Sequence, residues 1–389
     1  MNRTSDAEAA QQPQASALAY PALLAFGVLD AAGYSILAPV LPTIATTTRS
    51  GPATIGLLVA SFPVAMLAGF ALAGAAVRRA RISGVLLAAL TLLALGGTGF
   101  IVGHSLPAYL AARIVMGLGS GGVWIAVTFA ILERCPGQEY VCMSRILAAY
   151  SVGGLLGPAL GALGGVRSPF MAYLALATAT APLVAPLRLG APTSSRAFHS
   201  DRTALRLPGF WLAAAGNLLA VLGLGLAEGV LPLHFASRLD QPQIGVLYVG
   251  VALLAAASAA TAGSLPPRWV LAAATVLLVV GVTLAGAATA IPGFIIGLAL
   301  AGVGVGAGQT GAIGILLAAV APKRIVTAMV VWSQLGIVGY LAGPALGGAV
   351  AQAFGYRALG MVSLAAAAVV TVAFHVFQRA SGSPDDRPA

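Results

Sequence analysis

The stretch GGLLGPALGALGG spans residues 153–165 and lies inside a long apolar run, although glycine and proline both disfavour helix interiors. A second stretch near the other end of the chain, GYLAGPALGG at residues 339–348, contains the same five-residue core, GPALG. The prolines of the two cores, Pro158 and Pro344, are 186 residues apart. The repeated core at this separation indicates a chain built from two related halves.

The composition is that of a membrane protein. Hydrophobic residues make up 59% of the chain and charged residues only 8%, whereas a soluble protein carries roughly a quarter charged residues. The net charge of +10 comes from arginines scattered between apolar runs rather than clustered on one surface. This distribution is typical of loops between membrane spans, so we expect a lipid bilayer around the protein and no nucleic-acid partner.

A helix needs about 20 apolar residues to cross a bilayer. Twelve candidate spans meet this requirement: 17–44, 52–76, 83–103, 107–132, 143–165, 168–187, 208–236, 242–264, 268–290, 292–320, 325–352 and 357–377. We therefore predict an all-α membrane protein whose twelve transmembrane helices form two pseudo-symmetric six-helix bundles.

The spacing of the spans also predicts the domain organisation. We expect an N-terminal tail (1–16), a first six-helix bundle (17–187), a linker (188–207), a second bundle (208–378) and a C-terminal tail (379–389). An even number of spans places both termini on one side of the membrane.

The arginines predict which side that is. With cytoplasmic termini, fifteen of the twenty basic residues fall inside the cell, whereas Arg49, Arg167, Arg238 and Arg357 fall outside and Arg113 lies within a span. Cytoplasmic loops of membrane proteins carry such an excess of basic residues. We expect a multi-pass protein of the cell (inner) membrane with cytoplasmic tails and linker.

Further phrases repeat at nearly the same separation. PVLPTI at 39–44 matches GVLPLH at 229–234, and IGLLV at 55–59 matches IGVLY at 244–248. Transporters built from such repeats bind their substrate near the membrane midplane, in a cavity between the halves.

Glycines at a spacing of four line one face of two predicted helices: Gly153, Gly157 and Gly161 in the fifth, and Gly339, Gly343 and Gly347 in the eleventh. Small residues at this spacing let two helix backbones approach closely. Pro158 and Pro344 add a kink, which membrane helices tolerate when neighbours satisfy the freed backbone groups. Tight packing alone explains much of this pattern. The functional interpretation is that the matching helices of the two halves bend, and that the halves rock relative to each other during transport.

These motifs resemble those of the major facilitator superfamily, in particular its twelve-helix drug:proton antiporters. The antiporters carry G-x-x-x-G-P-x-x-G in the fifth helix, here Gly153, Gly157, Pro158 and Gly161. The superfamily's R-x-x-x-G-x-G in the fourth helix corresponds here to Arg113, Gly117 and Gly119. The resemblance covers essentially the whole chain and implies transport by alternating access.

Helices one and seven are similar to those of the vesicular amine transporters. Asp30 precedes P-x-x-P, and Glu228 precedes L-P in AEGVLP. The resemblance implies that these two acids handle substrate and protons. The chain departs from the pattern in the loop GAAVRRARIS, where Arg78 replaces an aspartate, and at Gln309 and Gln334, near which the amine transporters have acids.

Away from the ends of the predicted spans, the only charged residues are Asp30, Arg113 and Glu228. A charge there costs at least about 2.5 kcal/mol and is functional by default, so we expect the three to couple proton movement to transport. A structural ion pair between Asp30 and Arg113 is the alternative.

Polar and aromatic residues of the spans extend the candidate site. The expected substrate-binding set is Asp30, Tyr34, Trp124, Asn217, Glu228, Gln309 and Gln334. Asn217 and Glu228 are eleven residues apart, which places them on one helix face about 16 Å from each other. For Asn217 and the glutamines, a helix-to-helix hydrogen bond is the alternative role.

The function that these features predict is secondary active transport, as proton-coupled efflux of small lipophilic or cationic compounds. The alternatives are a uniporter or importer of a metabolite and a non-transporting sensor or scaffold. The chain lacks G-x-x-x-x-G-K-[S/T], H-E-x-x-H and G-x-S-x-G, so we expect neither an ATPase nor another enzyme. We expect no cofactor, no metal, a monomer, and two reduced thiols at Cys135 and Cys142.

Overall fold

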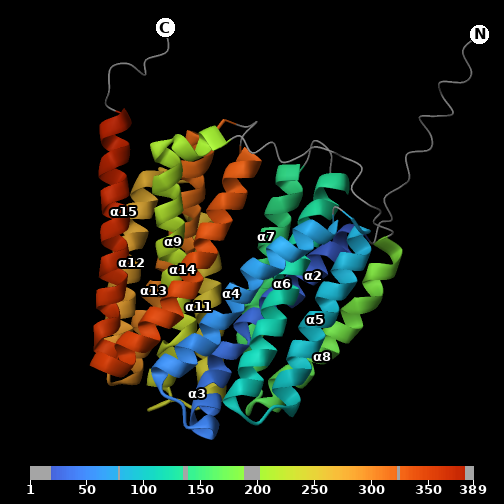
Figure 1. Cartoon of the computed structure of the whole chain (residues 1–389). Coiled ribbons are helices and arrows are strands. Elements are labelled where there is room, and N and C mark those ends of the chain that lie inside the picture. The colour runs from blue at the N-terminus through green and yellow to red at the C-terminus, as the bar shows by residue number, and fades with distance from the viewer. Residues whose placement is uncertain (1–18, 78, 135–138, 188–201, 322–324, 382–389) are drawn as a thin grey trace, which may run out of the picture.

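The computed structural model describes residues 19–77, 79–134, 139–187, 202–321 and 325–381. Every regular element within these ranges is a helix (Figure 1). The predicted N-terminal tail, most of the predicted linker and C-terminal tail, and Arg78 and Cys135 lie outside the described residues.

The helices follow the order of the predicted spans. The first half contains α2 (Ala19–Ser35), α3 (Leu37–Thr48), α4 (Pro52–Val77), α5 (Ile82–Val102), α6 (Leu106–Arg134), α7 (Glu139–Gly161), α8 (Arg167–Thr180) and the 3-10 helix η2 (Ala181–Leu187). The second half contains η3 (Arg202–Arg206), α9 (Pro208–Gly229), α10 (Leu231–Phe235), α11 (Gln241–Ala262), α12 (Pro267–Ala287), α13 (Ile291–Ala319), α14 (Ile325–Phe354), η5 (Tyr356–Ala358) and α15 (Leu359–Ser381).

Eleven stretches of the described residues are long and apolar enough to cross a membrane. The helix α7 is the remaining long helix, and it carries Arg145, Tyr150 and Ser151 among its apolar residues. The predicted all-helical membrane fold is confirmed.

The first and seventh predicted spans are each divided into a long and a short helix. The chain leaves the helix at Ile36, between α2 and α3, and again at Val230, between α9 and α10. Pro39 follows the first break and Pro232 the second. A proline fits the first turn of a helix because the N–H that it lacks has no partner there.

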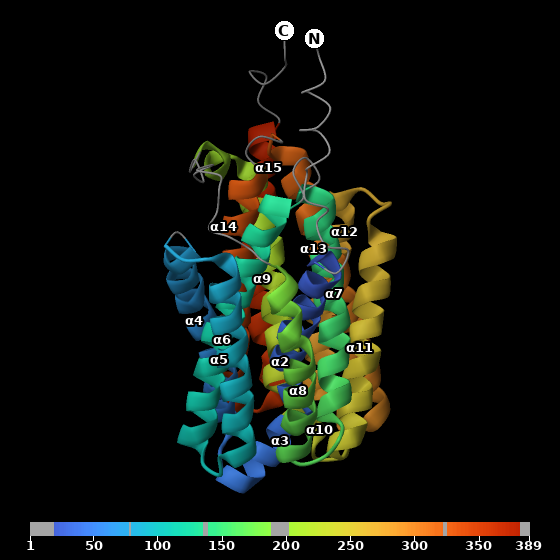
Figure 2. The same ribbon diagram turned by 90° about the vertical axis from the view of Figure 1, so that its right-hand side faces the viewer.

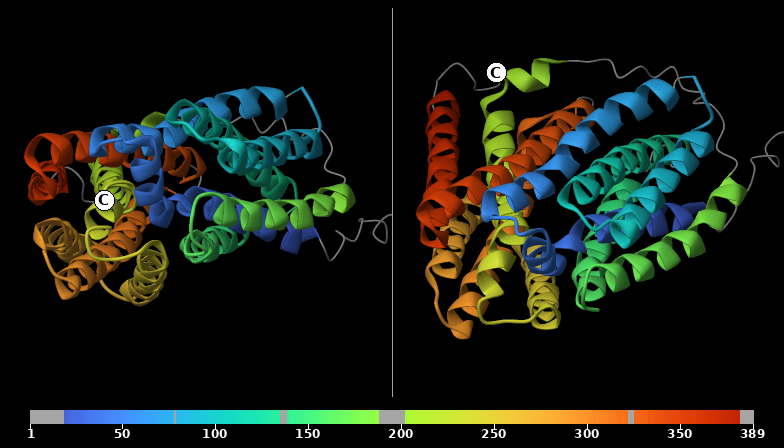
Figure 3. Two further views of the ribbon diagram at one scale, coloured as in Figure 1. Left: turned by 90° about the horizontal axis from the view of Figure 1, so that it is seen from below. Right: turned by 60° about the horizontal axis from the view of Figure 1, so that its bottom comes forward.

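The helices form two bundles, each with its own core. One buried apolar cluster consists almost wholly of residues from α2 to α8 and η2, and the other of residues from α9 to α15. Figure 3 shows the helices of the two halves on opposite sides of the molecule, with α4 beside α14. The start of α2 and the end of α15 lie at the same end of the bundles, which we call the terminal end (Figures 1 and 2).

The two glycine stripes pack helices together within each half. A Cβ atom placed on Gly157 would lie 2.7 Å from the carbonyl oxygen of Ala32 in α2, and one on Gly343 would lie 2.5 Å from that of Leu222 in α9. Only a residue without a side chain permits such approaches of two helix backbones. The stripes therefore hold the first and fifth spans of each half against each other.

The prolines of the two GPALG cores lie where the halves meet. A Cβ atom on Gly245 of α11 would lie 2.9 Å from the carbonyl oxygen of Pro158 in α7. In the matching crossing, Gly56 of α4 lies against the carbonyl of Pro344 in α14. Both crossings lie toward the end opposite the terminal end, so they close the molecule there.

Two glutamines of the second half form hydrogen bonds to the first half at the same closed end. The side-chain nitrogen of Gln241, at the start of α11, donates to the carbonyls of Gly161 and Gly165, both at 2.8 Å, and its oxygen accepts from the Thr43 hydroxyl at 2.7 Å. The oxygen of Gln352, in the last turn of α14, accepts from the backbone N–H of Ala53 at 3.1 Å. Every one of these hydrogen bonds joins one half to the other.

One minor expectation is wrong. Cys142 is disulfide-bonded rather than a reduced thiol.

Replacing Gln241 by leucine removes three hydrogen bonds between the halves and should weaken the closed end by about 1–3 kcal/mol. Spin labels on the exposed residues Thr46 and Ser237 report the separation of the halves there. We expect a longer-distance population to appear in the variant.

The matched control is Gln243→Leu, because Gln243 lies two residues away on the opposite side of α11, and its hydrogen bonds are to Asp240 of its own half. A distance distribution that is the same for Gln241→Leu and the control would show that these bonds do not hold the end closed.

Candidate functional site

A cavity of about 520 Å³ lies between the two halves. Its size falls within the range of small-molecule sites, about 300–1,000 Å³. One wall consists of small residues of α11 and α13, among them Ala252, Ala255, Gly302 and Gly306, and aromatic residues line much of the rest. The lining reaches Ala259, close to the terminal end of α11. Because the crossings close the opposite end, the cavity opens toward the terminal end.

Asp30 lies in the C-terminal half of α2 and is 1% exposed. Its Oδ2 atom accepts a hydrogen bond from the Tyr150 hydroxyl of α7 at 2.6 Å. Tyr150 meets Trp124 of α6 edge to face, with 5.2 Å between the ring centroids. The absence of a side chain at Gly27 lets the Tyr150 ring pack against α2, because a Cβ atom on Gly27 would lie 3.1 Å from the ring. The acid is thus held by groups from three helices of the first half.

Arg113 of α6 is fully buried and lies outside the lining of the cavity. Its two terminal nitrogens donate to the carbonyls of Gly33 at 3.3 Å and Tyr34 at 3.1 Å. These carbonyls belong to the last turn of α2 before the break at Ile36. The guanidinium also lies over the ring of Phe62, 4.2 Å from its centroid. Arg113 is therefore bound to the α2 backbone, and the Asp30–Arg113 ion pair does not form in this conformation.

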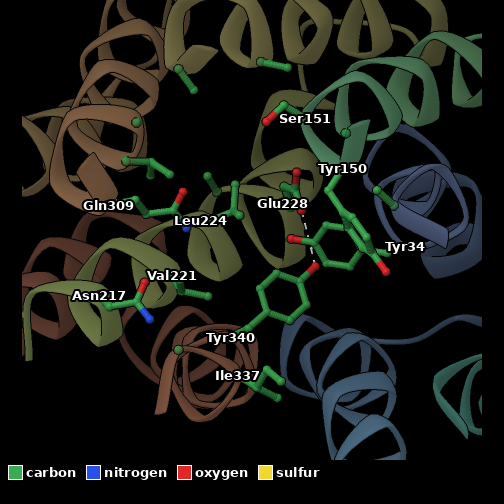
Figure 4. A pocket seen from close by; sticks show the side chains of 18 of the residues that line it. Tyr34, Tyr150, Ser151, Asn217, Val221, Leu224, Glu228, Gln309, Ile337 and Tyr340 are labelled. Atoms are coloured by element: carbon green, nitrogen blue, oxygen red, sulfur yellow. Dashed lines mark hydrogen bonds between the residues drawn. The ribbon is translucent and has the colours of Figure 1, made fainter. Parts of the chain in front are cut away.

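Glu228 lies at the closed end of the cavity, in the last turn of α9. Its Oε2 atom accepts from the Tyr340 hydroxyl of α14 at 3.3 Å. The Tyr340 ring packs against the Tyr34 ring of α2 with 4.7 Å between centroids, and Tyr34 packs against Phe62 at 6.0 Å. Figure 4 shows Glu228, Tyr34 and Tyr340 converging from the two halves. An acid of the second half thus lies beside the aromatic contact that joins the halves.

The two acids have the same kind of partner. In each half, an acid on the first span accepts a hydrogen bond from a tyrosine on the fifth span. The depths differ, because Glu228 lies eleven residues farther along its helix than Asn217, the residue near the repeat counterpart of Asp30. The cavity therefore has an acid midway along it and another at its closed end.

The remaining predicted residues divide into those that line the cavity and one that does not. Asn217 lines the cavity, and it also forms the helix-to-helix hydrogen bond considered as its alternative role, by donating to the carbonyl of Trp332 at 3.0 Å. Trp124, Tyr34 and Gln309 line the cavity as well. Gln334 is exposed and absent from the lining, so its predicted place is wrong. The helical rotation of 100° per residue instead turns the preceding residue, Ser333, toward the cavity.

The sequence reasoning missed several lining residues. Tyr150, Tyr340 and Tyr248 contribute hydroxyls, and Ser120 lines the cavity beside Asp30. The hydroxyl of Tyr248 donates to the carbonyl of Ala227, next to Glu228. These tyrosines could have been identified from the sequence, because each lies in the middle of an apolar span and a buried hydroxyl needs a hydrogen-bond partner.

The cavity can hold an organic cation. It offers two carboxylates and several aromatic faces, both of which attract positive charge. The neighbouring cation, Arg113, is turned to the backbone of α2. No group of three or more histidine, cysteine or acidic side chains that could hold a metal ion occurs in the described part of the chain.

Comparison with known proteins identifies the family of this fold. The sequence profile of the Major Facilitator Superfamily matches residues 23–225 and 213–389. No curated protein matches the sequence.

Three crystal structures illustrate the similarity of the fold. A bacterial homologue of the human lysosomal transporter Spinster, inward-facing and unoccupied, aligns with a TM-score of 0.78 and 14% identity over 96% of this chain and 100% of that one. The nucleoside transporter NupG aligns with a TM-score of 0.69 and 14% identity over 92% and 98%. A D-xylose–proton symporter aligns with a TM-score of 0.62 and 15% identity over 90% and 96%.

Replacing Tyr150 by phenylalanine removes the hydroxyl that donates to Asp30. A hydrogen bond to a charged group contributes about 1.5–3 kcal/mol, so the ionised acid should lose that support. We expect the affinity of the purified protein for a lipophilic cation, such as tetraphenylphosphonium, to fall at least about tenfold. Isothermal titration calorimetry measures this change.

The matched control is Tyr20→Phe, which removes a hydroxyl of α2 that donates to the Cys142 carbonyl, outside the cavity. Equal affinities for the two variants would contradict a role of Tyr150 in holding Asp30 for a cation.

Proposed function

The chain belongs to the Major Facilitator Superfamily, and we propose that it is a proton-coupled antiporter that exports small lipophilic or cationic compounds. The observation that carries the proposal is the pair of acids that line the cavity, the buried Asp30 and the partly buried Glu228. Each comes from a different half, lines the cavity and has a tyrosine rather than a base as its hydrogen-bond partner.

A carboxylate without a basic partner can exchange a cation for a proton. In an apolar site the ionised form needs a positive charge nearby, which either a proton or a cationic substrate supplies. Binding of one therefore disfavours binding of the other, as antiport requires. The sharing of one negative charge by two competitors is the physical basis that we propose for coupling.

The shape of the molecule agrees with one state of alternating access. The cavity opens toward the terminal end, and the crossings of α4 with α14 and of α7 with α11 close the other end. If the termini are cytoplasmic, as the arginine distribution predicts, this is the state that takes up substrate from the cell. We propose that the protein works in this orientation in the cell (inner) membrane, as a monomer.

The chemistry of the wall favours lipophilic substrates over sugars or nucleosides. The second-half wall is formed largely by alanine, glycine and valine of α11 and α13. A hydroxyl-rich substrate would leave its polar groups unpaired against such a surface, and each unpaired group costs free energy. This argues against metabolite import, although the fold is shared with a D-xylose–proton symporter. The similarity of Asp30 and Glu228 to the acids of the vesicular amine transporters also supports a cationic substrate.

Replacing Asp30 by asparagine should abolish transport driven by a pH gradient, because the amide keeps the shape of the side chain but cannot bind the coupling proton. Counterflow, which exchanges substrate for substrate without net proton movement, should persist at a reduced rate. Both are measured in proteoliposomes with the same preparation.

Asp240→Asn is the matched control, since Asp240 caps α11 outside the cavity and asparagine caps a helix equally well. If Asp30→Asn still concentrates substrate against its gradient, Asp30 is not the coupling acid.

Glu228→Gln should weaken the binding of cationic ligands by about 1–4 kcal/mol, the attraction of two charges about 4 Å apart at an effective dielectric between 80 and 20. Glu228→Asp should be milder, and matched neutral ligands should respond less. Equal losses for cationic and neutral ligands, together with lower thermal stability, would instead indicate that Glu228 acts only by bonding to Tyr340 at the junction of the halves.

A further inference from the structure

Buried polar atoms that lack a hydrogen-bond partner are concentrated in one part of the molecule. Among the described residues there are four: Asp30 Oδ1, Arg113 Nε, the Tyr173 hydroxyl and Ser363 Oγ. The first three belong to α2, α6 and α8 of the first half, and each of these side chains is at most 1% exposed. Native proteins satisfy nearly all buried polar groups, so a cluster of three needs a physical explanation.

The three side chains meet around Gly33. A Cβ atom on Gly33 would lie 2.5 Å from the hydroxyl of Tyr173. The Tyr173 hydroxyl can therefore pack against α2 only because residue 33 has no side chain. Arg113 donates to the carbonyl of the same glycine at 3.3 Å. Asp30 precedes Gly33 by three residues, a spacing that places two residues on one face of a helix. One turn of α2 therefore brings the three groups together.

This cluster lies behind Asp30 with respect to the cavity. Asp30 and its partner Tyr150 line the cavity, whereas Arg113 and Tyr173 do not. The oxygen Oδ2 is bonded to Tyr150, and the Ser120 hydroxyl of α6 lies close to the carboxylate, but the other oxygen, Oδ1, has no partner in hydrogen-bond geometry. Asp30 thus has one carboxylate oxygen that is hydrogen-bonded by a residue of the cavity lining, and a second oxygen that still lacks a hydrogen-bond donor.

The unpartnered atoms have complementary chemistry. Asp30 Oδ1 accepts hydrogen bonds, Arg113 Nε donates one, and the Tyr173 hydroxyl does both. A buried water molecule makes about three hydrogen bonds, to just such a mixture of donors and acceptors. A metal cation fits poorly, because the fixed positive charge of Arg113 would repel it.

We infer that Asp30, Arg113 and Tyr173 together hold at least one internal water molecule between α2, α6 and α8. The water donates to Asp30 Oδ1, accepts from Arg113 Nε and bonds to the Tyr173 hydroxyl. Its effect on transport rests on the proposed function: it supports the ionised acid at the oxygen that Tyr150 leaves free. The charge of Asp30 can then persist while the cavity is empty, between release of a proton and arrival of a substrate.

X-ray radiolysis tests the site directly, because hydroxyl radicals formed from bound water modify the side chains beside it. We expect Tyr173 of the intact wild-type protein to be modified several-fold faster than Phe170. Phe170 is the matched control, since it lies one turn away on α8 and is equally buried in an apolar stack with Phe100. Equal and minimal modification of both residues would overturn the inference, whatever the protein transports.

Tyr173→Phe tests the role of the water. The variant removes one partner of the water and should reduce gradient-driven transport about tenfold, while counterflow changes less. Tyr109→Phe is the control, because Tyr109 is a buried tyrosine of α6 that stacks on Phe100. If Tyr173 is modified by radiolysis and Tyr173→Phe transports like the control, the proposed support of Asp30 by the water is wrong. A failure of Asp30→Asn to uncouple transport would count against the proposed function and leave the radiolysis result intact.

Discussion

A glycine of each half lies against the carbonyl of a proline in the other half: Gly245 against Pro158, and Gly56 against Pro344. These two crossings bring backbones together without side chains between them, so they close one end of the molecule to solvent. The position of the cavity follows from them, because the halves diverge from the crossings toward the terminal end. The depth of Glu228 follows too, since the closed end places it beside Tyr34 of the other half.

The same constraint explains the uneven use of polar residues. Within the apolar spans the backbones pack through glycine and alanine, and hydrogen bonds between the halves concentrate at the closed end, at Gln241 and Gln352. At that end, water can replace these hydrogen bonds when the halves separate. The bonds therefore stabilise the closed conformation but still allow it to open. In the interior, a broken hydrogen bond would leave an unpaired group in an apolar surrounding. Each of the two acids accepts a hydrogen bond from a tyrosine of its own half, and Glu228 has Tyr34 of the other half as a further hydrogen-bonding neighbour.

The sequence predicted the fold because each span carries its own signal. Long apolar runs, repeated phrases and the scarcity of charge all depend on local composition, and a membrane demands that every span satisfy its backbone internally. The three charges inside the spans were found for the same reason, since an isolated charge in an apolar run stands out. The prediction for Gln334 was wrong because composition cannot fix the rotation of a helix about its axis. Neighbouring helices fix it, and they turn Ser333 to the cavity.

Only the tertiary structure decided which groups the charged side chains contact. The sequence identified Asp30 and Arg113 as charges that could pair, but the break of α2 at Ile36 places backbone carbonyls next to Arg113, and the guanidinium bonds to these instead. Tyr150 and Tyr173 are ordinary aromatic residues of apolar spans in the sequence. They become the surroundings of Asp30 because glycines of α2, at 27 and 33, leave room for their side chains. Composition and periodicity along the chain thus determined which groups enter the membrane. Which of them meet depends on contacts between helices distant in sequence, and no local pattern encodes those contacts.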